Sequence, residues 1–446
     1  MPKELSGKKF HSSPFQIIML GFFWVILLGA FLLSLPISSN AGVWTPFYDS
    51  LFTATSATCV TGLVVKDTAT YWSVFGKVIL FILIQTGGLG VVTVGATFML
   101  MTKKRFSLSH QALMQEAISA NQLGGITQQL RFIVFGVLIF EGCGAILLYP
   151  VFLKEFGAVK AIFYAIFHSV SAFCNAGFDL MGVRAPFSSL TTLQGSVLLN
   201  VTVVLLILTG GIGFATWDDV RKHKFHFKRY SLQSKLVLTT TFFLVLIPFL
   251  LLFFFEYPAL SGKERVLASL FQAVTPRTAG FNTMDYGAMN EDGIVMTIFL
   301  MICGGASGST AGGMKINTLA VLLASSYAVT RRKKDVSAFG RRIDQETVLK
   351  AGALLLIYLG LSLGSALVLC YIEKLPYLTC LFETTSAVAT VGLTMGITAG
   401  LSHVSGIILI FLMFFGRLGG LTMFYAAFSD NKGKSGRYPV EHVNVG

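Results

Sequence analysis

The sequence predicts an all-α polytopic membrane protein, in which four parallel repeats supply eight transmembrane helices and four re-entrant pore helices around one central pore. Three observations predict it. Apolar residues make up 54% of the 446 residues and charged residues only 12%, against about a quarter charged in ordinary soluble domains. Long apolar stretches alternate with short ones. One short motif occurs four times in the same orientation.

Eight apolar stretches are long enough to cross the hydrocarbon core of a bilayer, for which a helix needs about 20 residues. The first follows a polar, basic N-terminus and is longer than the apolar part of a signal peptide, so we interpret it as a transmembrane helix. The stretches lie at 15–35, 74–101, 132–152, 193–217, 236–255, 294–328, 351–371 and 405–428.

A short apolar segment lies between the two members of each pair of long stretches, and each is too short to span a bilayer. A stretch that contains glycine follows every one of them. Irregular backbone is tolerated within a membrane only where protein buries it or where it lines a watery cavity. The segments are therefore predicted to be re-entrant half-helices, at 47–57, 161–172, 266–275 and 377–387.

The short segments align as one motif that opens with an apolar residue and Phe and closes with Gly. Its copies are SLFTATSATCVTGL (50–63), AIFHSVSAFCNAGF (165–178), SLFQAVTPRTAGF (269–281) and CLFETTSAVATVGL (380–393). A second block follows each copy: TGGLGVVT (86–93), TGGIGFAT (209–216), CGGASGST (303–310) and FGRLGGLT (415–422). Four copies in one orientation predict four helix–half-helix–helix units around an axis.

The expected organisation is four repeats at 15–104, 132–220, 236–330 and 351–428, with loops at 105–131, 221–235 and 331–350 and terminal segments at 1–14 and 429–446. Of the 34 lysine and arginine residues, 23 fall in or beside these loops and termini. The positive-inside rule therefore places the loops and both termini in the cytoplasm. Their basic residues either set this topology or contact acidic lipid or an acidic partner.

Several other classes of function are excluded. The net charge of +13 is spread between apolar spans and forms no single face, which argues against a nucleic-acid partner. The six cysteines show no C-x-x-C spacing, so neither a disulfide framework nor a zinc site is expected. No Walker A, H-E-x-x-H or nucleophile-elbow context occurs, so we expect no enzyme and no cofactor in this chain.

Half-helices that point their C-terminal ends inward would place partial negative charge toward the axis. The extended backbone after them would offer rings of carbonyl oxygens that replace the hydration shell of a cation. The side chains there are mostly small or neutral, so backbone carbonyls and a dehydrated monovalent cation are favoured. The candidate ion-binding residues are Val60, Thr61, Gly62, Asn175, Ala176, Gly177, Thr278, Ala279, Gly280, Thr390, Val391 and Gly392.

The last helix of the third repeat differs from its counterparts because it carries five glycines between positions 304 and 313. They cost a helix about 4–5 kcal/mol relative to alanine, which predicts a break and a gating loop at 303–313. Close packing of small residues is the alternative, and it is our expectation for the glycine blocks of repeats 1 and 2. The candidate gating residues are Gly304, Gly305, Ser307, Gly308, Ser309, Thr310, Gly312 and Gly313.

Arg417 stands where the other three copies have glycine. A charged residue within the membrane marks a functional site, and three roles are open: binding the carbonyls of the broken loop, repelling cations below the filter, or clamping the repeats together. Lys315 is expected to extend to the cytoplasmic interface. Glu383 is expected either to attract cations at the mouth or to cap its helix.

The four-fold pattern, the glycine-rich interruption in the third repeat and the arginine in the last helix resemble the Trk/Ktr/HKT superfamily of potassium transporters, and most closely its Ktr-type membrane subunits. The resemblance covers essentially the whole chain. It implies that Gly62, Gly177, Gly280 and Gly392 line one K+ filter. Relatives with serine in the first repeat favour Na+, so Gly62 points to K+.

The resemblance also implies an intramembrane gating loop, a homodimer in the cell membrane, and a cytosolic ring of RCK-type, KtrA-like regulatory subunits that bind nucleotides such as ATP or ADP. Alternatives remain. A Na+-permeable or Na+-coupled carrier working by alternating access predicts inverted repeats, whereas these repeats are parallel. A membrane enzyme or receptor predicts clustered titratable residues within the bilayer, and the sequence has none.

Overall fold

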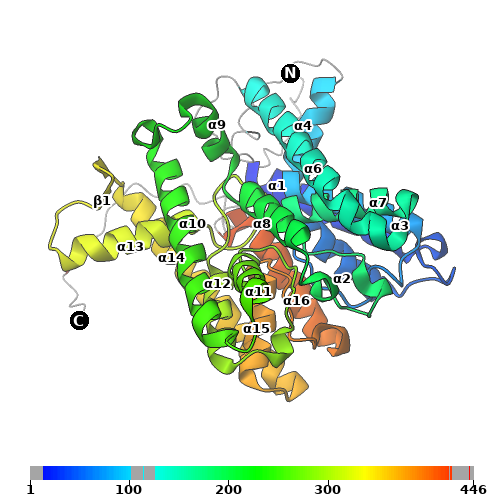
Figure 1. The fold of residues 1–446 in the computed structure, drawn as a ribbon. Coiled ribbons are helices and arrows are strands. Elements are labelled where there is room, and N and C mark those ends of the chain that lie inside the picture. Colours follow the sequence, from blue (N-terminus) through cyan, green and yellow to red (C-terminus); the bar gives the residue numbers. More distant parts are fainter. Residues whose placement is uncertain (1–13, 102–113, 115–125, 421, 424–440, 442–446) are drawn as a thin grey trace, which may run out of the picture.

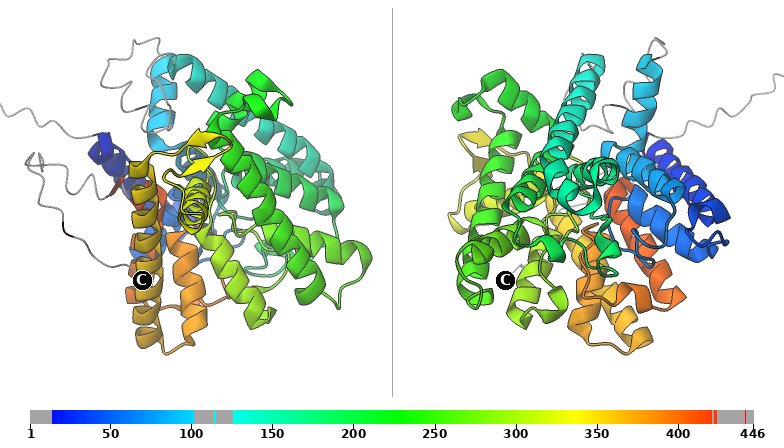
Figure 2. Two further views of the ribbon diagram at one scale, coloured as in Figure 1. Left: turned by 90° about the vertical axis from the view of Figure 1, so that its left-hand side faces the viewer. Right: turned by 45° about the vertical axis from the view of Figure 1, so that its right-hand side comes forward.

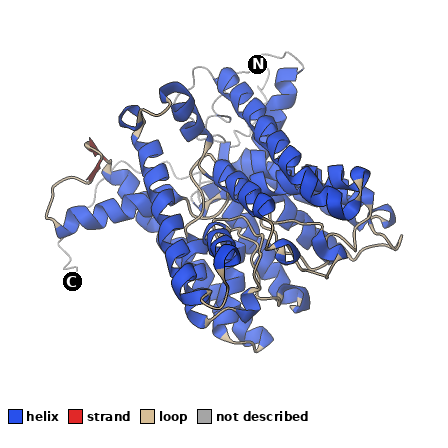
Figure 3. Ribbon diagram, in the orientation of Figure 1, coloured by secondary structure: helices blue, strands red, loops and turns tan. Residues whose placement is uncertain are grey.

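The computed structural model describes residues 14–101, 114, 126–420, 422–423 and 441, and helices joined by loops make up most of this part of the chain (Figures 1 and 3). The strands within it form one antiparallel hairpin, β1 (Ser337–Ala338) and β2 (Arg341–Arg342). The predicted all-helical class is confirmed. Most of the predicted loop at 105–131 and of both terminal segments lies outside the described residues.

Within the described residues, four helices are long and apolar enough to cross a membrane, and each begins one of the predicted repeats. Helix α10 is extended by a π-helical turn at Leu252–Glu256. The four are α1 (Pro14–Ser34), α6 (Ile126–Phe156), α10 (Leu232–Leu251) and α14 (Gln345–Glu373).

A shorter helix follows each long one and packs along it, as α14 and the helix after it do in Figure 2. These helices match the four predicted half-helices to within a few residues. They are α2 (Phe47–Thr58), α7 (Ala158–Phe173), α11 (Gly262–Val274) and α15 (Tyr377–Val388).

The second long helix is interrupted in every repeat. In repeat 1, α3 (Val74–Leu89) meets α4 (Val91–Met101) at 97°, and in repeat 2, α8 (Val197–Gly211) meets α9 (Phe214–His223) at 96°. In repeat 3 the loop 303–315 separates α12 (Glu291–Ile302) from α13 (Ile316–Thr330). In repeat 4, α16 (His403–Leu418) ends at a turn. Among the described residues, four helices, or six spans if each bent pair is one, meet the length and hydropathy needed to cross a bilayer.

Helix breaks in repeats 1 and 2 correct the expectation that their glycine blocks serve close packing and not a break, and the second helix of repeat 4 also ends at this place. The glycines at one place in the repeated block, Gly90, Gly213 and Gly419, have φ of +86°, +88° and +85°. Side chains with a Cβ are strained in this region of φ, and glycine is not. The expected close packing is also present, because a Cβ on Gly87 or Gly210 would lie 2.0 Å from a carbonyl oxygen at the end of α2 or α7.

Serine side chains start the second helix in three of the repeats. Ser73, Ser196 and Ser402 are the N-caps of α3, α8 and α16, and each hydroxyl accepts a hydrogen bond from the backbone N–H three residues later. Such a cap satisfies one of the free N–H groups at a helix start and contributes about 1 kcal/mol. The caps fix where the second helix of the repeat begins.

The distribution of side chains suits a bilayer. Large apolar side chains face outward, with Trp24 65%, Ile146 73% and Leu356 72% exposed. The short helices are largely buried, and α2 and α15 are rich in hydroxyl groups, including Ser56 and Ser386. An apolar exterior around a more polar centre is expected where lipid, not water, surrounds the protein.

Candidate functional site

The chain leaves all four short helices in the same conformation. The residue two before the closing glycine and the glycine itself have positive φ, with a residue of negative φ between them. Positive φ is uncommon for residues other than glycine, and its recurrence at one place marks a functional segment. The values are +49° and +99° for Val60 and Gly62, +56° and +68° for Asn175 and Gly177, +69° and +78° for Thr278 and Gly280, and +52° and +89° for Thr390 and Gly392.

A hydroxyl residue on each short helix braces this segment. The Ser56 carbonyl oxygen accepts a hydrogen bond from Thr61 N (2.8 Å), and its hydroxyl accepts one from Gly62 N (3.1 Å). Ser386 makes the same two bonds in repeat 4. In repeats 2 and 3, the Ser171 and Thr275 hydroxyls donate to the carbonyl after the glycine. The sequence interpretation gave these residues no role, although the repeated Ser-Ala pair is a signal for it.

The four predicted glycines meet at one place. A Cβ on Gly62 would lie 2.7 Å from the Ala176 oxygen, and one on Gly392 would lie 1.9 Å from the Thr61 oxygen. Likewise, Gly177 lies against the Ala279 oxygen and Gly280 against the Val391 oxygen. Each of these carbonyls belongs to the residue before a closing glycine. The four repeats therefore bring glycines and carbonyl oxygens together in a ring, in which a Cβ on any of the four glycines would have to displace backbone atoms.

A cavity of about 270 Å³ lies on the side to which the chain leaves the ring. Its lining includes the four closing glycines and three aspartates, Asp67, Asp179 and Asp285, from the loops of repeats 1, 2 and 3. Carboxylates at the mouth of a narrow site raise the local concentration of cations. We call this space the outer cavity.

The loop 303–315 lies against the opposite side of the ring. The Asn175 amide donates to the Thr310 hydroxyl (3.3 Å), and that hydroxyl donates to the Phe173 oxygen (2.9 Å). A Cβ on Gly312 would lie 2.0 Å from Thr390 Oγ1. The predicted gating residues are therefore next to the first residues of the candidate filter.

Three side-chain oxygens at this level have no hydrogen-bond partner among the described residues: Asn175 Oδ1, Thr278 Oγ1 and Thr390 Oγ1. They occupy the same position in repeats 2, 3 and 4 and all are buried. Buried polar oxygens normally have partners. These three are available to a cation or to water between the ring and the loop.

Backbone groups freed by the break find partners in repeats 2 and 4. Ala306 N donates to the Gly211 oxygen (2.8 Å), and Phe214 N donates to the Gly308 oxygen (2.8 Å). Gly313 N donates to the Gly416 oxygen (3.2 Å). The interruptions of the other helices thus supply the hydrogen bonds that irregular backbone needs within a membrane.

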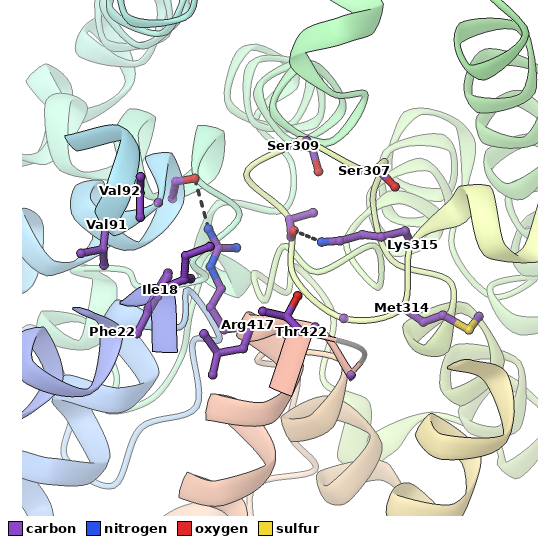
Figure 4. Close-up of a pocket in the computed structure, with 18 of the residues that line it drawn as sticks. Ile18, Phe22, Val91, Val92, Ser307, Ser309, Met314, Lys315, Arg417 and Thr422 are labelled. Carbon is purple, nitrogen blue, oxygen red and sulfur yellow. Dashed lines mark hydrogen bonds between the residues drawn. The ribbon is translucent and has the colours of Figure 1, made fainter. Parts of the chain in front are cut away.

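Arg417 joins three repeats. Its guanidinium donates to the Thr310 oxygen in the loop of repeat 3 (2.5 Å) and to the oxygens of Gly88 (3.2 Å) and Gly87 in repeat 1. Figure 4 shows Arg417 in a cavity of about 280 Å³ on this side of the ring, which Ser307 and Ser309 also line. Of the three roles open for Arg417, these bonds fit binding the loop carbonyls and clamping the repeats together.

Two expectations about charged residues are wrong. Lys315 does not extend to the interface: its ammonium folds back and donates to the Ala311 (2.7 Å) and Gly312 (3.3 Å) oxygens, because the break leaves these carbonyls without helical partners. Figure 4 shows Lys315 and Arg417 reaching the cavity from two sides. Glu383 is fully buried in the middle of α15, so it neither faces the mouth nor caps the helix.

Apolar spans around a ring of backbone carbonyls, with a broken helix beneath it, define a membrane transport protein. The chain belongs to the TrkH cation transport protein family, whose model matches residues 11–435. It is therefore a member of a family of transporters and not an enzyme.

Relatives and solved structures agree with this family. The chain is 39% identical over 445 residues to the potassium/sodium uptake protein NtpJ of Enterococcus hirae, covering 97% of each chain. It is 39% identical over 452 residues to the Ktr system potassium uptake protein B of Bacillus subtilis, covering 100% of each. The crystal structure of the potassium transporter TrkH from Vibrio parahaemolyticus has the same fold, with a TM-score of 0.72 at 18% identity over 94% of this chain and 85% of that one.

Proposed function

We propose that this chain takes up potassium across the cell membrane through one central pore, with the ring of glycines and carbonyl oxygens as its selectivity filter. The observation that carries the proposal is the meeting of Gly62, Gly177, Gly280 and Gly392 against each other's neighbouring carbonyls. Rings of backbone carbonyls replace the hydration shell of K+ in channels. The names of the relatives, which are potassium or potassium/sodium uptake proteins, support the same substrate.

The proposed architecture is four parallel repeats with the boundaries given above, eight membrane spans and four re-entrant helices. It counts each interrupted second helix as one span. The bent pairs in repeats 1 and 2 support this count, since each pair meets the length and hydropathy of a span only when taken together. The abundance of lysine and arginine in the loops supports cytoplasmic termini.

K+ is the proposed ion, and Na+ is the alternative. The resemblance to the transporter superfamily supports K+, because its members with serine in place of the first glycine favour Na+ and this chain has glycine there. The name of the Enterococcus hirae relative includes sodium. Competition between Na+ and Rb+ uptake separates the two.

The proposed gate is the loop 303–315, and Arg417 is proposed to hold it closed. The hydrogen bonds from Arg417 to Thr310 and from Asn175 to Thr310 support a loop that lies across the ion path. Movement of the loop would have to break these bonds, which is the property of a gate with two states.

Regulation by a cytosolic, nucleotide-binding ring of RCK-type, KtrA-like subunits and assembly as a homodimer are further parts of the proposal. They rest on the resemblance and on the printed name of the Bacillus subtilis relative, which assigns that protein to a Ktr system. Co-purification with an RCK-type subunit, with and without ATP or ADP, tests the first. The mass of the purified protein in detergent tests the second.

Uptake of Rb+, a tracer for K+, tests the proposed function. Cells lacking their own K+ uptake systems should grow at limiting K+ and accumulate Rb+ when they express this chain with an RCK-type subunit. Vesicles containing the purified protein should show the same uptake, and excess Na+ should compete only weakly. Absence of Rb+ uptake in both systems would contradict the proposal.

A further inference from the structure

One position in the repeated motif is buried in all four repeats, and its side chains belong neither to the proposed filter nor to the proposed gate. It is the residue directly after the apolar-Phe pair: Thr53, His168, Gln272 and Glu383 in repeats 1 to 4. All four are buried, with at most 1% of the residue exposed. Buried residues of such polarity need partners, and the partners show a pattern.

Glu383 holds the loop that follows the filter of its own repeat. One carboxylate oxygen accepts hydrogen bonds from the Thr394 hydroxyl (2.5 Å) and from Met395 N (3.1 Å). The other accepts from the Thr398 hydroxyl (2.9 Å). Thr394 and Thr398 both line the outer cavity beside Gly392. A single buried side chain thus fixes one wall of this cavity.

His168 does the same in repeat 2. Its Nε2 accepts a hydrogen bond from Leu180 N (3.2 Å), and its Nδ1 lies 2.8 Å from the Tyr164 oxygen, to which it donates. Leu180 comes directly after Asp179, which lines the outer cavity. The imidazole therefore ties the loop to α7 and leaves neither nitrogen free.

Gln272 does the same in repeat 3. Its Nε2 donates to the Met284 oxygen (3.2 Å), and its Oε1 accepts from the Tyr286 hydroxyl (2.9 Å). Asp285, between these two residues, lines the outer cavity. Three different side chains thus make the same kind of link by different chemistry.

Repeat 1 is the exception. The Thr53 hydroxyl donates to the Asp49 oxygen one turn earlier in its own helix. The loop of repeat 1 is held by contacts that do not involve the short helix. The Asp67 carboxylate, in this loop, accepts hydrogen bonds from Ala69 N (3.0 Å) and from Phe187 N of repeat 2 (2.9 Å). Thr53 is therefore a matched control at the same position of the fold.

We propose that His168, Gln272 and Glu383 are positioning residues that hold the loops around the outer cavity and so set how well a cation reaches the filter. This inference rests on the proposed function, since it assumes that ions cross the ring from the outer cavity. The hydroxyl brace at Ser56, Ser171, Thr275 and Ser386 holds the filter itself. The position proposed here holds the segment outside it, from the same short helix.

The test compares variants that remove the link with variants that keep it. Glu383→Leu, His168→Leu and Gln272→Leu remove it, whereas Glu383→Gln and His168→Gln retain an acceptor oxygen for the loop. Thr53→Val is the control. Rb+ uptake is measured over a range of Rb+ concentrations and with competing Na+.

The expected result for Glu383→Leu is an apparent KM for Rb+ raised about tenfold, because three hydrogen bonds to the buried carboxyl group are lost, with stronger inhibition by Na+. Glu383→Gln should restore most of the affinity, and Thr53→Val should match the unmodified chain. A variant that only folds less well would show a lower maximal rate of uptake and an unchanged KM.

Changing the other partner of the link keeps the inference testable if Glu383→Leu does not fold. The double variant Thr394→Val, Thr398→Val removes two donors and leaves Glu383 in place, and it should also raise KM. Folded variants whose KM and Na+ inhibition equal those of Thr53→Val would overturn the inference. Absence of Rb+ uptake by the unmodified chain would instead contradict the proposed function.

Discussion

Arg417 on α16 donates a hydrogen bond to the carbonyl oxygen of Thr310 at 2.5 Å, and so joins the fourth repeat to the loop that interrupts the third. The same guanidinium reaches the Gly87 and Gly88 oxygens at the end of α3. Carbonyl groups at helix ends lack helical partners. One side chain with several donors therefore supplies hydrogen bonds to free carbonyls at the breaks of two repeats at once. This explains why an expensive charge is retained within the membrane.

Replacing Arg417 tests whether this contact holds the loop closed. Arg417→Gln should raise Rb+ uptake without the regulatory partner by roughly fivefold or more, because a charge-assisted bond to the loop is lost. Arg417→Lys separates two explanations. If the several N–H donors of the guanidinium matter, Arg417→Lys should behave like Arg417→Gln, since an ammonium cannot bridge the loop carbonyl and the α3 carbonyls. If the positive charge matters because it repels cations, Arg417→Lys should behave like the unmodified chain.

Arg221→Gln is the control for these variants. Arg221 forms an exposed ion pair with Asp218, at 2.8 Å, and such pairs contribute little to stability. Uptake by this variant should be unchanged. A decrease in uptake by Arg417→Gln, with the protein folded, would favour the clamp over the gate.

The contact between the loop and the filter predicts a second effect. A Cβ on Gly312 would lie 2.0 Å from Thr390 Oγ1, so Gly312→Ala must push the loop or the filter segment aside. We expect overpacking to lower the free energy of unfolding by about 1–3 kcal/mol. Gly352→Ala in α14 meets nothing within 4 Å and should leave stability equal or slightly higher. Equal thermal midpoints of the two variants would refute a loop packed against Thr390.

The bend between α3 and α4 depends on backbone conformation and not on space. Gly90 has φ of +86°, and its Cβ would come no closer than 3.8 Å to Thr93 Oγ1. Gly90→Ala should therefore destabilise the protein by about 1–2 kcal/mol through strain alone. Gly95→Ala, five residues later in α4, has open space and no positive φ. It should stabilise the helix by up to about 1 kcal/mol, and thermal unfolding in detergent compares the two.

The sequence predicts the bounds of α2 and α15 well because marked residues flank both helices, whereas α7 and α11 begin three and four residues before the predicted starts. Pro46 and Pro376 precede α2 and α15, and a glycine with positive φ follows each. The breaks in repeats 1 and 2 could not be predicted in the same way. The glycines of TGGLG and TGGIG suit both close packing and a left-handed turn, and the structure uses them for both.

The hydrogen-bond acceptors of the site also cannot be predicted from sequence patterns. Arg417 stands out as a charge in an apolar span, but its partners are main-chain oxygens of Gly87, Gly88 and Thr310, and every residue has such an oxygen. Lys315 was misplaced for the same reason. Glu383 was misplaced because its partners lie in the loop after the filter, and only the fold brings that loop back onto α15.

Gly62→Ser and Gly392→Ser test most directly whether the four glycines form one K+-selective filter. A side chain on Gly392 would collide with the Thr61 oxygen at 1.9 Å, so it must displace a carbonyl of the ring. Gly360→Ser, which meets nothing within 4 Å, is the control. The measurement is Rb+ uptake in competition with Na+. Both filter variants should lose their preference for Rb+ while Gly360→Ser keeps it; unchanged selectivity in both variants would contradict the proposed filter.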